Sequence, residues 1–468
     1  MSELWQKSAA ELTAGYGRGD FTPSEAVGAC LDRLRAMEPH IAAFLEVFDD
    51  DARRDAVASG ERWRAGCPKS PLDGVPISVK DNLHVAGHTT TWGSRTLRGF
   101  RPAADELPVA RARAAGLIFL GKTNLPEFAM RGVTANTLGG PSRNPHDTTL
   151  TPGGSTGGGA AAVAAGVGPL ALGTDGGGSI RRPASHCGLV GFKPSAGRVP
   201  RGGGLPEMFG AHEVAGVIGR DLDDVGATLE ILCGAPLAGT AGPRLLHVPT
   251  FSGAPVDPGI AAEVRRAAEA FAGLGFAVDE AADFDLADAI NAGWTTLFDA
   301  GLAWMFADPK RWPEWRDGPD PAEIEGRMGE PARESLARGR AMSAAALFEL
   351  LHAVDVAKGR LAAVFERYDA ILTPATAALP WPAAENHPAT IAGRPVGPRG
   401  HAVFTAIGNA AGLPGLALPT GWVGDLPTGI QLLGRPGGDG DLLALGRVFA
   451  AARPFDRRWP LPGEASRG

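Results

Sequence analysis

The sequence predicts an α/β fold built around a central β-sheet within one domain, residues 1–468. Three observations support this prediction. The 468 residues exceed a typical single core but fit one large α/β unit with insertions. From Pro71 onward, short apolar runs alternate with helical segments, a pattern typical of a sheet with helical crossovers. Apolar runs of the same kind return near the C-terminus, so we expect them to complete the same sheet.

Residues 1–70 are expected to form a helical N-terminal part. In "FTPSEAVGACLDRLRAME", Thr22 can cap a helix, Pro23 suits its first position, and Glu25 completes a capping box. The following apolar residues recur at helical spacing: Ala26, Val27, Cys30, Leu31, Leu34 and Met37. This segment therefore predicts one amphipathic helix.

The rest of the chain divides into three parts. Residues 71–235 contain the runs "GVPISVK", "ARAAGLIFLGKTN" and "AAAVAAGVGPLALGT", and residues 369–460 contain "YDAILTPAT", "GLPGLALPTG" and "GIQLLGRP". Residues 285–345 differ, because they carry Trp294, Trp304, Trp312 and Trp315 among charged residues. Two interpretations stay open for these tryptophans, either packing within a helical layer or an aromatic rim over a substrate cleft. We expect this part to be a variable insertion on the substrate side.

Composition narrows the class of protein. The net charge is −7 without a dense basic run, which argues against a nucleic-acid partner. The four cysteines, Cys30, Cys67, Cys187 and Cys233, are scattered, so neither a disulfide framework nor a zinc site is indicated. The sequence shows no secretory leader pattern and no apolar run of membrane length. We therefore expect a cytoplasmic protein of enzyme size that has no membrane partner.

Two short motifs suggest other functions. "GLIFLGKT", Gly116–Thr123, fits the P-loop pattern and raises the alternative of a nucleotide-binding protein. Its four middle residues are apolar, however, and are typical of a buried strand rather than a phosphate-binding loop. "GGSTG", 153–157, fits the nucleophile elbow of α/β-hydrolases, but the turn-like "NPHDTTLTPG" precedes it where an elbow needs a strand.

Three consecutive glycines, Gly176, Gly177 and Gly178, stand directly before Ser179 in "GTDGGGSIRRPAS". Apolar segments flank them on both sides. This favours a packed backbone that passes close to another group, rather than a flexible linker on the surface. Two further segments carry a side chain that could take part in catalysis. "GVPISVKDN" has Lys80 after a predicted strand, and "TPGGSTGGGAAAVAAG" has Ser155 among glycines. The serines are 24 residues apart, and the lysine stands 75 residues before the first.

Taken together, these three segments resemble the amidase signature family. The resemblance extends to "GKTNLPEFA", "GLVGFKPSAGRVP", "LTPATAALP" and "GLPGLALPTG" and covers most of the chain. It implies a central mixed β-sheet covered by helices on both faces. It also implies that Ser179 attacks the amide carbonyl, that Ser155, held by a cis peptide bond, relays the proton, and that Lys80 is the base. No metal or organic cofactor is then required.

The chemistry of amide cleavage explains these residue types. A serine hydroxyl needs a base within hydrogen-bonding reach, and Lys80 can serve only if its pKa falls from roughly 10.4. We therefore expect a buried lysine. The backbone amides of Gly176, Gly177 and Gly178, with that of Ser179, are expected to form an oxyanion hole. Four further residues are expected to support the site: Thr174 and Thr156 beside Lys80 and Ser155, and Asp175 with Arg181 either as a brace for the loop or as an unrelated surface pair.

The exact residues of two motifs inform the choice of function. The wording "GGSTGG" with "GTDGGGSIR" is most similar to a bacterial subgroup that includes 6-aminohexanoate cyclic dimer hydrolases. We expect a stand-alone amidase, monomeric or homodimeric, that acts on a small-molecule amide and on esters as well. The alternatives are a glutamine-hydrolysing subunit of an amidotransferase complex, the nucleotide-binding protein, and a binding protein on an inactive amidase scaffold. The sequence does not identify the substrate.

Overall fold

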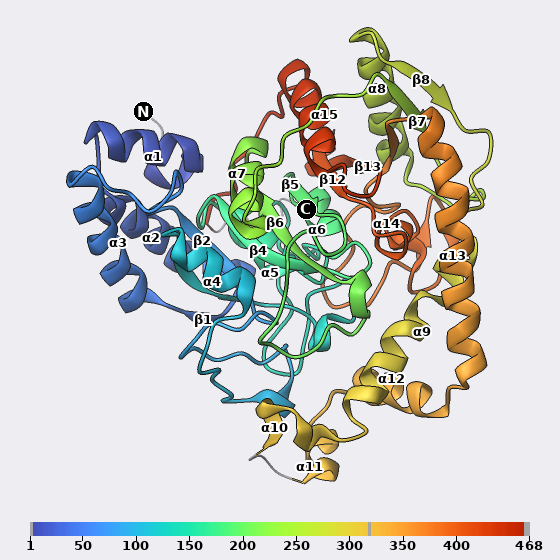
Figure 1. Cartoon of the computed structure of the whole chain (residues 1–468), viewed down its shortest axis with the longest axis horizontal. Coiled ribbons are helices and arrows are strands. Elements are labelled where there is room, and N and C mark those ends of the chain that lie inside the picture. The colour runs from blue at the N-terminus through green and yellow to red at the C-terminus, as the bar shows by residue number, and fades with distance from the viewer. Residues whose placement is uncertain (1–2, 317–319, 463–468) are drawn as a thin grey trace.

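The computed structural model is built around one mixed β-sheet (Figure 1). It describes residues 3–316 and 320–462, and within these ranges eleven strands lie side by side in the order β1-β3-β2-β4-β6-β5-β12-β13-β9-β7-β8. Strands β10 and β11 form a separate ribbon. The strands are β1 (Phe44–Val47), β2 (Pro76–Lys80), β3 (Ile118–Thr123), β4 (Leu170–Asp175), β5 (Val190–Lys193), β6 (Val214–Gly219), β7 (Arg244–His247), β8 (Ala277–Glu280), β9 (Ala370–Pro374), β10 (Thr390–Ile391), β11 (Arg394–Pro395), β12 (Gly415–Val423) and β13 (Leu426–Gly434).

The sheet is mixed because it contains both parallel and antiparallel strand pairs. Strand β2 is parallel to β3 and β4, and β7 is parallel to β8 and β9. Between these groups, β6 is antiparallel to β4 and β5, and β12 is antiparallel to β5 and β13. The predicted α/β class with a mixed central sheet is confirmed, and the C-terminal strands β9, β12 and β13 lie in this sheet.

Helices cover both faces of the sheet, as expected. Along β4, Leu170 and Leu172 pack into one apolar cluster with α4, α7, α8 and α15, whereas Ala171 packs on the opposite face with α5 and α6. This alternation follows from the two-residue period of a strand. The helices are α1 (Ala9–Arg18), α2 (Pro23–Ile41), α3 (Asp49–Arg64), α4 (Leu107–Ala114), α5 (Gly157–Ala164), α6 (Arg181–His186), α7 (Leu222–Cys233), α8 (Pro258–Gly273), α9 (Asp288–Met305), α10 (Pro313–Arg316), α11 (Pro321–Gly326), α12 (Glu330–Ala341), α13 (Ala344–Arg367), α14 (Ala406–Ala410) and α15 (Asp439–Ala452).

The N-terminal part contains the predicted capped helix and one strand that was not predicted. Thr22 caps α2 through the amide of Glu25, whose carboxylate accepts from the amide of Thr22, and Pro23 occupies the first turn. Residues 1–70 contain helices α1, α2 and α3, but they also contribute β1, which was not predicted and which pairs antiparallel with β3 at the sheet edge. A four-residue edge strand between two helices is too short to give a clear alternating pattern.

The P-loop interpretation of residues 116–123 is also wrong. Residues 118–123 form the fully buried strand β3, so their amides bond neighbouring strands. Lys122 lies 3.0 Å from the Asp81 carboxylate and donates to the carbonyl of Leu83. This lysine is therefore already bound within the core and is not available to hold a phosphate.

Of the segment 285–345, residues 317–319 lie outside the described residues, and the rest contains helices α9 to α12 at one end of the molecule, beside the long helix α13 (Figure 1). Trp294 and Trp315 are buried, and Trp304 is 47% exposed and contacts the half-buried Trp312 edge to face. None of the four is among the described residues that line the cavity described below. Trp294 nevertheless contacts the glycine loop before Ser179, because its Nε1 donates to the carbonyl oxygen of Gly176 at 2.8 Å. Thr295, next to Trp294 on α9, does line the cavity. In the part of the chain that the structure describes, no helix has the length and apolar character needed to cross a membrane.

Candidate active site

Lys80 and Thr174 meet because β2 and β4 are parallel neighbours that end at the same edge of the sheet. Lys80 is the last residue of β2, and its side chain is fully buried. Its Nζ lies 2.9 Å from Thr174 Oγ1 and 3.3 Å from the Thr174 carbonyl oxygen. The third partner of Nζ is Ser155 Oγ at 2.7 Å. A protonated amine can donate to all three oxygens, and a neutral amine can donate to two of them and accept from the Ser155 hydroxyl.

The surroundings of Lys80 bring its pKa close to neutrality. Burial lowers the pKa of Lys80 to about 7, although the negative charges of Glu213 and Asp175 oppose the fall. Glu213 is itself buried and lies 3.7 Å from Arg201. A lysine with this pKa is partly neutral at pH 7 and can act as a proton acceptor.

Ser155 lies in the glycine-rich loop that leads into α5. The Gly154–Ser155 peptide bond is cis, and Ser155 is buried beside Lys80. The loop packs tightly against a neighbouring segment, since a Cβ on Gly157 would lie 2.1 Å from Thr134 Oγ1. Only glycine fits that position without moving Thr134. Thr156 anchors the other side of the loop, because its Oγ1 donates to the Thr174 carbonyl oxygen at 3.1 Å.

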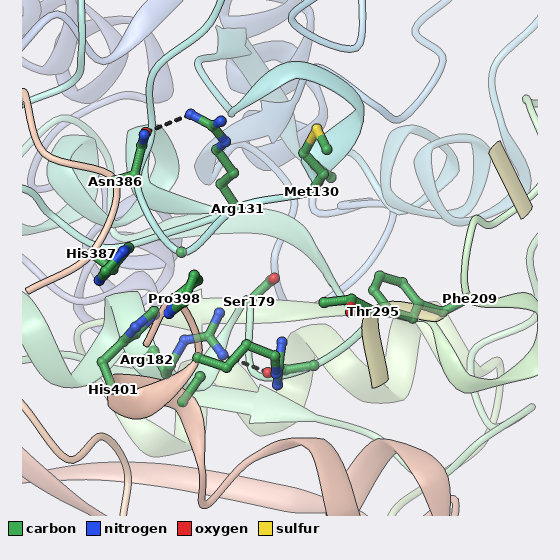
Figure 2. A pocket seen from close by; sticks show the side chains of 15 residues that line it. Met130, Arg131, Ser179, Arg182, Phe209, Thr295, Asn386, His387, Pro398 and His401 are labelled. Carbon is green, nitrogen blue, oxygen red and sulfur yellow. Dashed lines mark hydrogen bonds between the residues drawn. The ribbon is translucent and has the colours of Figure 1, made fainter. Parts of the chain in front are cut away.

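Ser179 follows β4 and stands in the turn before α6. The amide of Thr156 donates to the Ser179 carbonyl oxygen at 3.1 Å, which joins the two serine-bearing loops through their backbones. Among the described residues, no hydrogen bond connects Ser179 Oγ to Ser155 Oγ or to any other group. Figure 2 shows Ser179 at the centre of a cavity, with its hydroxyl directed into the open space.

The three glycines before Ser179 differ in their surroundings. Gly178 has φ +108°, and a Cβ there would lie 2.3 Å from Thr405 Oγ1, so this position requires glycine. The amide of Gly178 donates to Asp175 Oδ1 at 2.6 Å, and it is therefore not free for another acceptor. In the part of the chain that the structure describes, the amides of Gly176, Gly177 and Ser179 have no such partner. The expectation that Gly178 donates to an oxyanion is corrected accordingly.

A buried ion pair lies beside this glycine loop. Asp175 and Arg181 are both fully buried, with Arg181 Nη2 at 2.9 Å from Asp175 Oδ1 and Nε at 3.0 Å from Oδ2. Burial alone would raise the pKa of Asp175, but the Arg181 charge holds it well below its usual range. Asn409 adds a further contact, because its Nδ2 donates to the carbonyl oxygen of Asp175 at 2.8 Å. The two residues are therefore not a surface pair, and their role as a brace for the loop stays a prediction.

The cavity in front of Ser179 has a volume of about 280 Å³. Phe209 and Thr295 lie on one side of the serine, and Arg182 and His401 lie on the other (Figure 2). Its full lining is Ala129, Met130, Arg131, Gly132, Gly177, Ser179, Arg182, Phe209, Thr295, Asn386, His387, Pro398, Arg399, His401 and Ala402. Among the described residues, no group of three or more His, Cys, Asp or Glu side chains is arranged to hold a metal ion.

The structure brings the predicted site residues into one region and adds others that the sequence patterns did not indicate. Lys80, Ser155 and Thr174 are in direct contact, and the backbone of Ser179 contacts that of Thr156. The missed residues are Glu213, Arg399, His401, Thr405 and Asn409. Each comes from another part of the chain and lies in a segment without a distinctive local motif, so no pattern near the serines indicates it.

Comparisons with known proteins place the chain in a family. Residues 25–443 match the family described as Amidase. A glutamyl-tRNA(Gln) amidotransferase subunit from Symbiobacterium thermophilum is 34% identical over 94% of this chain and 96% of that protein. Two solved structures, a bacterial aryl acylamidase of the amidase signature family and 6-aminohexanoate cyclic dimer hydrolase with substrate, have TM-scores of 0.88 and 0.83. They are 28% and 26% identical, and each comparison covers 98% of this chain and 99% of the other. The chain therefore belongs to the amidase family.

Proposed function

We propose that this protein hydrolyses a carboxylic amide through an acyl-enzyme on Ser179. The observation that carries the proposal is the buried contact of 2.7 Å between Lys80 Nζ and Ser155 Oγ, behind a serine hydroxyl that faces a cavity. A serine–lysine arrangement is an established alternative to a Ser–His–Asp triad. Membership of the amidase family supports the same reaction class.

In the proposed first half-reaction, Ser179 Oγ attacks the amide carbon. Its proton passes to Ser155 Oγ as the proton of Ser155 passes to neutral Lys80 Nζ. The carbonyl oxygen becomes an anion, and the free amides of Gly176, Gly177 and Ser179 are the donors available to stabilise it. The C–N bond then breaks, and the proton returns through Ser155 to the leaving nitrogen. Ammonia or an amine departs, and an ester remains on Ser179.

In the second half-reaction, water attacks the ester carbon and gives up its proton along the same path. The Ser179–acyl bond breaks, Ser179 regains its proton, and the carboxylic acid leaves as its carboxylate. Esters enter the same path, because an alcohol is an easier leaving group than an amine. The site residues that we propose need no metal or organic cofactor for these steps.

A second candidate function is the hydrolysis of glutamine within an amidotransferase complex. The similarity to a glutamyl-tRNA(Gln) amidotransferase subunit over nearly the whole chain favours this candidate. Free glutamine carries an α-ammonium group, and the described residues that line the cavity include three arginines but no Asp or Glu to pair with it. Ammonia release by the isolated chain from glutamine and from amides without an ammonium group distinguishes the two candidates.

Labelling with a fluorophosphonate tests the proposed nucleophile. The probe is expected to form one adduct on the peptide that carries Ser179, and the Ser179→Ala variant is expected to form none. Ser185→Ala is a matched control, since this nearby buried hydroxyl has no hydrogen-bond partner among the described residues. Its labelling should equal that of the wild type. A folded wild-type protein that takes up no label, or takes it up at another residue, would refute the proposal.

A further inference from the structure

The wall of the cavity contains a guanidinium group without a partner. The Nε and Nη2 atoms of Arg399 are closed off from solvent and have no hydrogen-bond partner among the described residues. Arg399 itself lines the cavity. A buried cation is costly to a fold unless an opposite charge or hydrogen-bond acceptors compensate it.

Other buried arginines near the site do have partners. Arg181 is paired with Asp175, and Arg201 lies between Glu106 and Glu213. Arg182 has no carboxylate partner among the described residues, but its two terminal nitrogens donate to the carbonyl oxygens of Gly177 and Gly154. In the described part of the chain, Nε of Arg182 and the two terminal nitrogens of Arg201 also lack hydrogen-bond partners, but other atoms of those two groups have them. Arg399 differs because, among the described residues, no nitrogen of its guanidinium group has a hydrogen-bond or ion-pair partner.

The electrostatic surroundings keep this site positive. Burial lowers the pKa of Arg399 to about 10. Burial and the nearby charge of Arg399 lower the pKa of Arg182 to about 9. Both groups therefore remain charged near pH 7. His401 is 3% exposed, and neither of its ring nitrogens has a partner in the described part of the chain. Its pKa lies well below the usual range because of burial and the two arginines, so it is a neutral donor and acceptor.

The unpartnered guanidinium lies close to the reacting serine. A Cβ placed on Gly177 would lie 3.9 Å from Arg399 Nη2, which puts this group beside the loop two residues before Ser179. Arg399 is only partly buried, and its Nη1 is not among the closed-off atoms, so this nitrogen is the one that a carboxylate oxygen in the cavity can reach. Two guanidinium groups without a carboxylate partner among the described residues, Arg399 and Arg182, and the neutral His401 line this cavity, and together they fit an anionic group such as a carboxylate.

We propose that Arg399, with His401 beside it, binds a carboxylate group carried by the substrate, so that the substrates are amides of acidic molecules. This inference rests on the proposed function of Ser179. It assigns to the cavity a preference for an amide with a carboxylate over a neutral amide of the same length. It also makes an added ammonium group unfavourable in the same cavity.

A matched series of amides tests the preference. Ammonia release is measured from the monoamides of malonate, succinate, glutarate and adipate, and from neutral primary amides of equal chain length. Glutamine completes the series as glutarate monoamide with an added α-ammonium group. At least one acidic monoamide should exceed its neutral counterpart by about 10- to 100-fold in kcat/KM, and glutamine should be a poorer substrate than glutarate monoamide. Equal rates for acidic and neutral amides would overturn the inference.

Variants locate the effect at Arg399. Arg399→Met should raise KM for the acidic amide and bring the ratio of kcat/KM for the acidic amide to that for the neutral amide close to one. Arg399→Gln serves as the second variant if the methionine variant does not fold. Arg394→Met is the matched control, since Arg394 is exposed in the same segment and outside the cavity. A preference that survives both Arg399 substitutions would overturn the inference.

Protection experiments separate this inference from the proposed function. Glutarate should slow fluorophosphonate labelling of Ser179 in the wild type and in Arg394→Met, but not in Arg399→Met. Inorganic phosphate is the second arm, and protection by phosphate without protection by any carboxylate would show a phosphate site and contradict the inference. If Ser179 is labelled and no carboxylate protects it, only the inference fails. If Ser179 is never labelled in folded protein, the proposed function fails first.

Discussion

Lys80 Nζ lies 2.7 Å from Ser155 Oγ inside the protein, and both side chains are buried. The contact joins the end of β2 to the glycine-rich loop before α5. It places an amine with a pKa of about 7 against a hydroxyl, at the junction of the two loops that carry the serines. The proposed proton path depends on this relationship.

The first prediction concerns the base. Lys80→Met should lower kcat/KM by about 10²- to 10⁴-fold, which is the usual contribution of a general base. In the wild type, activity should rise with pH through about 7, because the base acts only after it loses its proton. Lys193 is a second buried lysine with a pKa of about 7, so Lys193→Met is the control. If folded Lys193→Met loses this rise, then Lys193 rather than Lys80 sets the pH profile.

The second prediction concerns the proton relay. Ser155→Ala should reduce the rate by about 10²- to 10⁴-fold, while the free energy of unfolding falls by only about 1 kcal/mol for the lost hydrogen bond. Ser78→Ala is the matched control, because this buried hydroxyl on β2 has no hydrogen-bond partner among the described residues. Rates and denaturant unfolding are measured together. Wild-type activity in Ser155→Ala would show that Lys80 receives the proton by another path.

The third prediction concerns Glu213, a residue that no sequence pattern indicated. Its negative charge raises the pKa of Lys80. Glu213→Gln should therefore lower this pKa and move the rise in activity to lower pH, by up to roughly one unit. Glu207→Gln is the control, because Glu207 also contacts Arg201 but is not among the charges that shift Lys80. A pH profile of Glu213→Gln that moves to higher pH, or does not move, would contradict the proposed influence of Glu213.

The fourth prediction concerns the brace of the glycine loop. Asp175→Asn leaves the buried Arg181 without its counter-charge and should destabilise the fold by about 3–5 kcal/mol. Asp223→Asn is the control, since the ion pair of Asp223 with Arg447 is exposed and should contribute about 0–1 kcal/mol. Thermal and denaturant unfolding measure both effects. Equal stability of the two variants would mean that the buried pair does not hold the loop.

The sequence allowed prediction of those features that local patterns encode. Helix α2 follows from its cap at Thr22, and the three site segments follow from a strand or a run of glycines beside Lys80, Ser155 and Ser179. The edge strand β1 was missed because four residues give too little periodicity.

The cavity depends on contacts between distant parts of the chain, and this part of the site could not be predicted. Arg399 and His401 come from a loop between β11 and α14, more than 200 residues after Ser179. These two side chains stand out because their buried nitrogens have no hydrogen-bond partner among the described residues of the folded protein. No local sequence pattern indicates such a feature. The oxyanion donors illustrate the same limit, because only the structure shows that the Gly178 amide already bonds Asp175.

The most direct test of the proposed mechanism is to trap the acyl-enzyme. The protein is mixed rapidly with p-nitrophenyl acetate, quenched in acid and analysed by intact mass and peptide mapping, with Ser179→Ala in parallel. The mechanism predicts a burst of p-nitrophenol and one acetyl group on the peptide that carries Ser179, both absent from the variant. An acetyl group on another residue, or turnover that persists in Ser179→Ala, would contradict it.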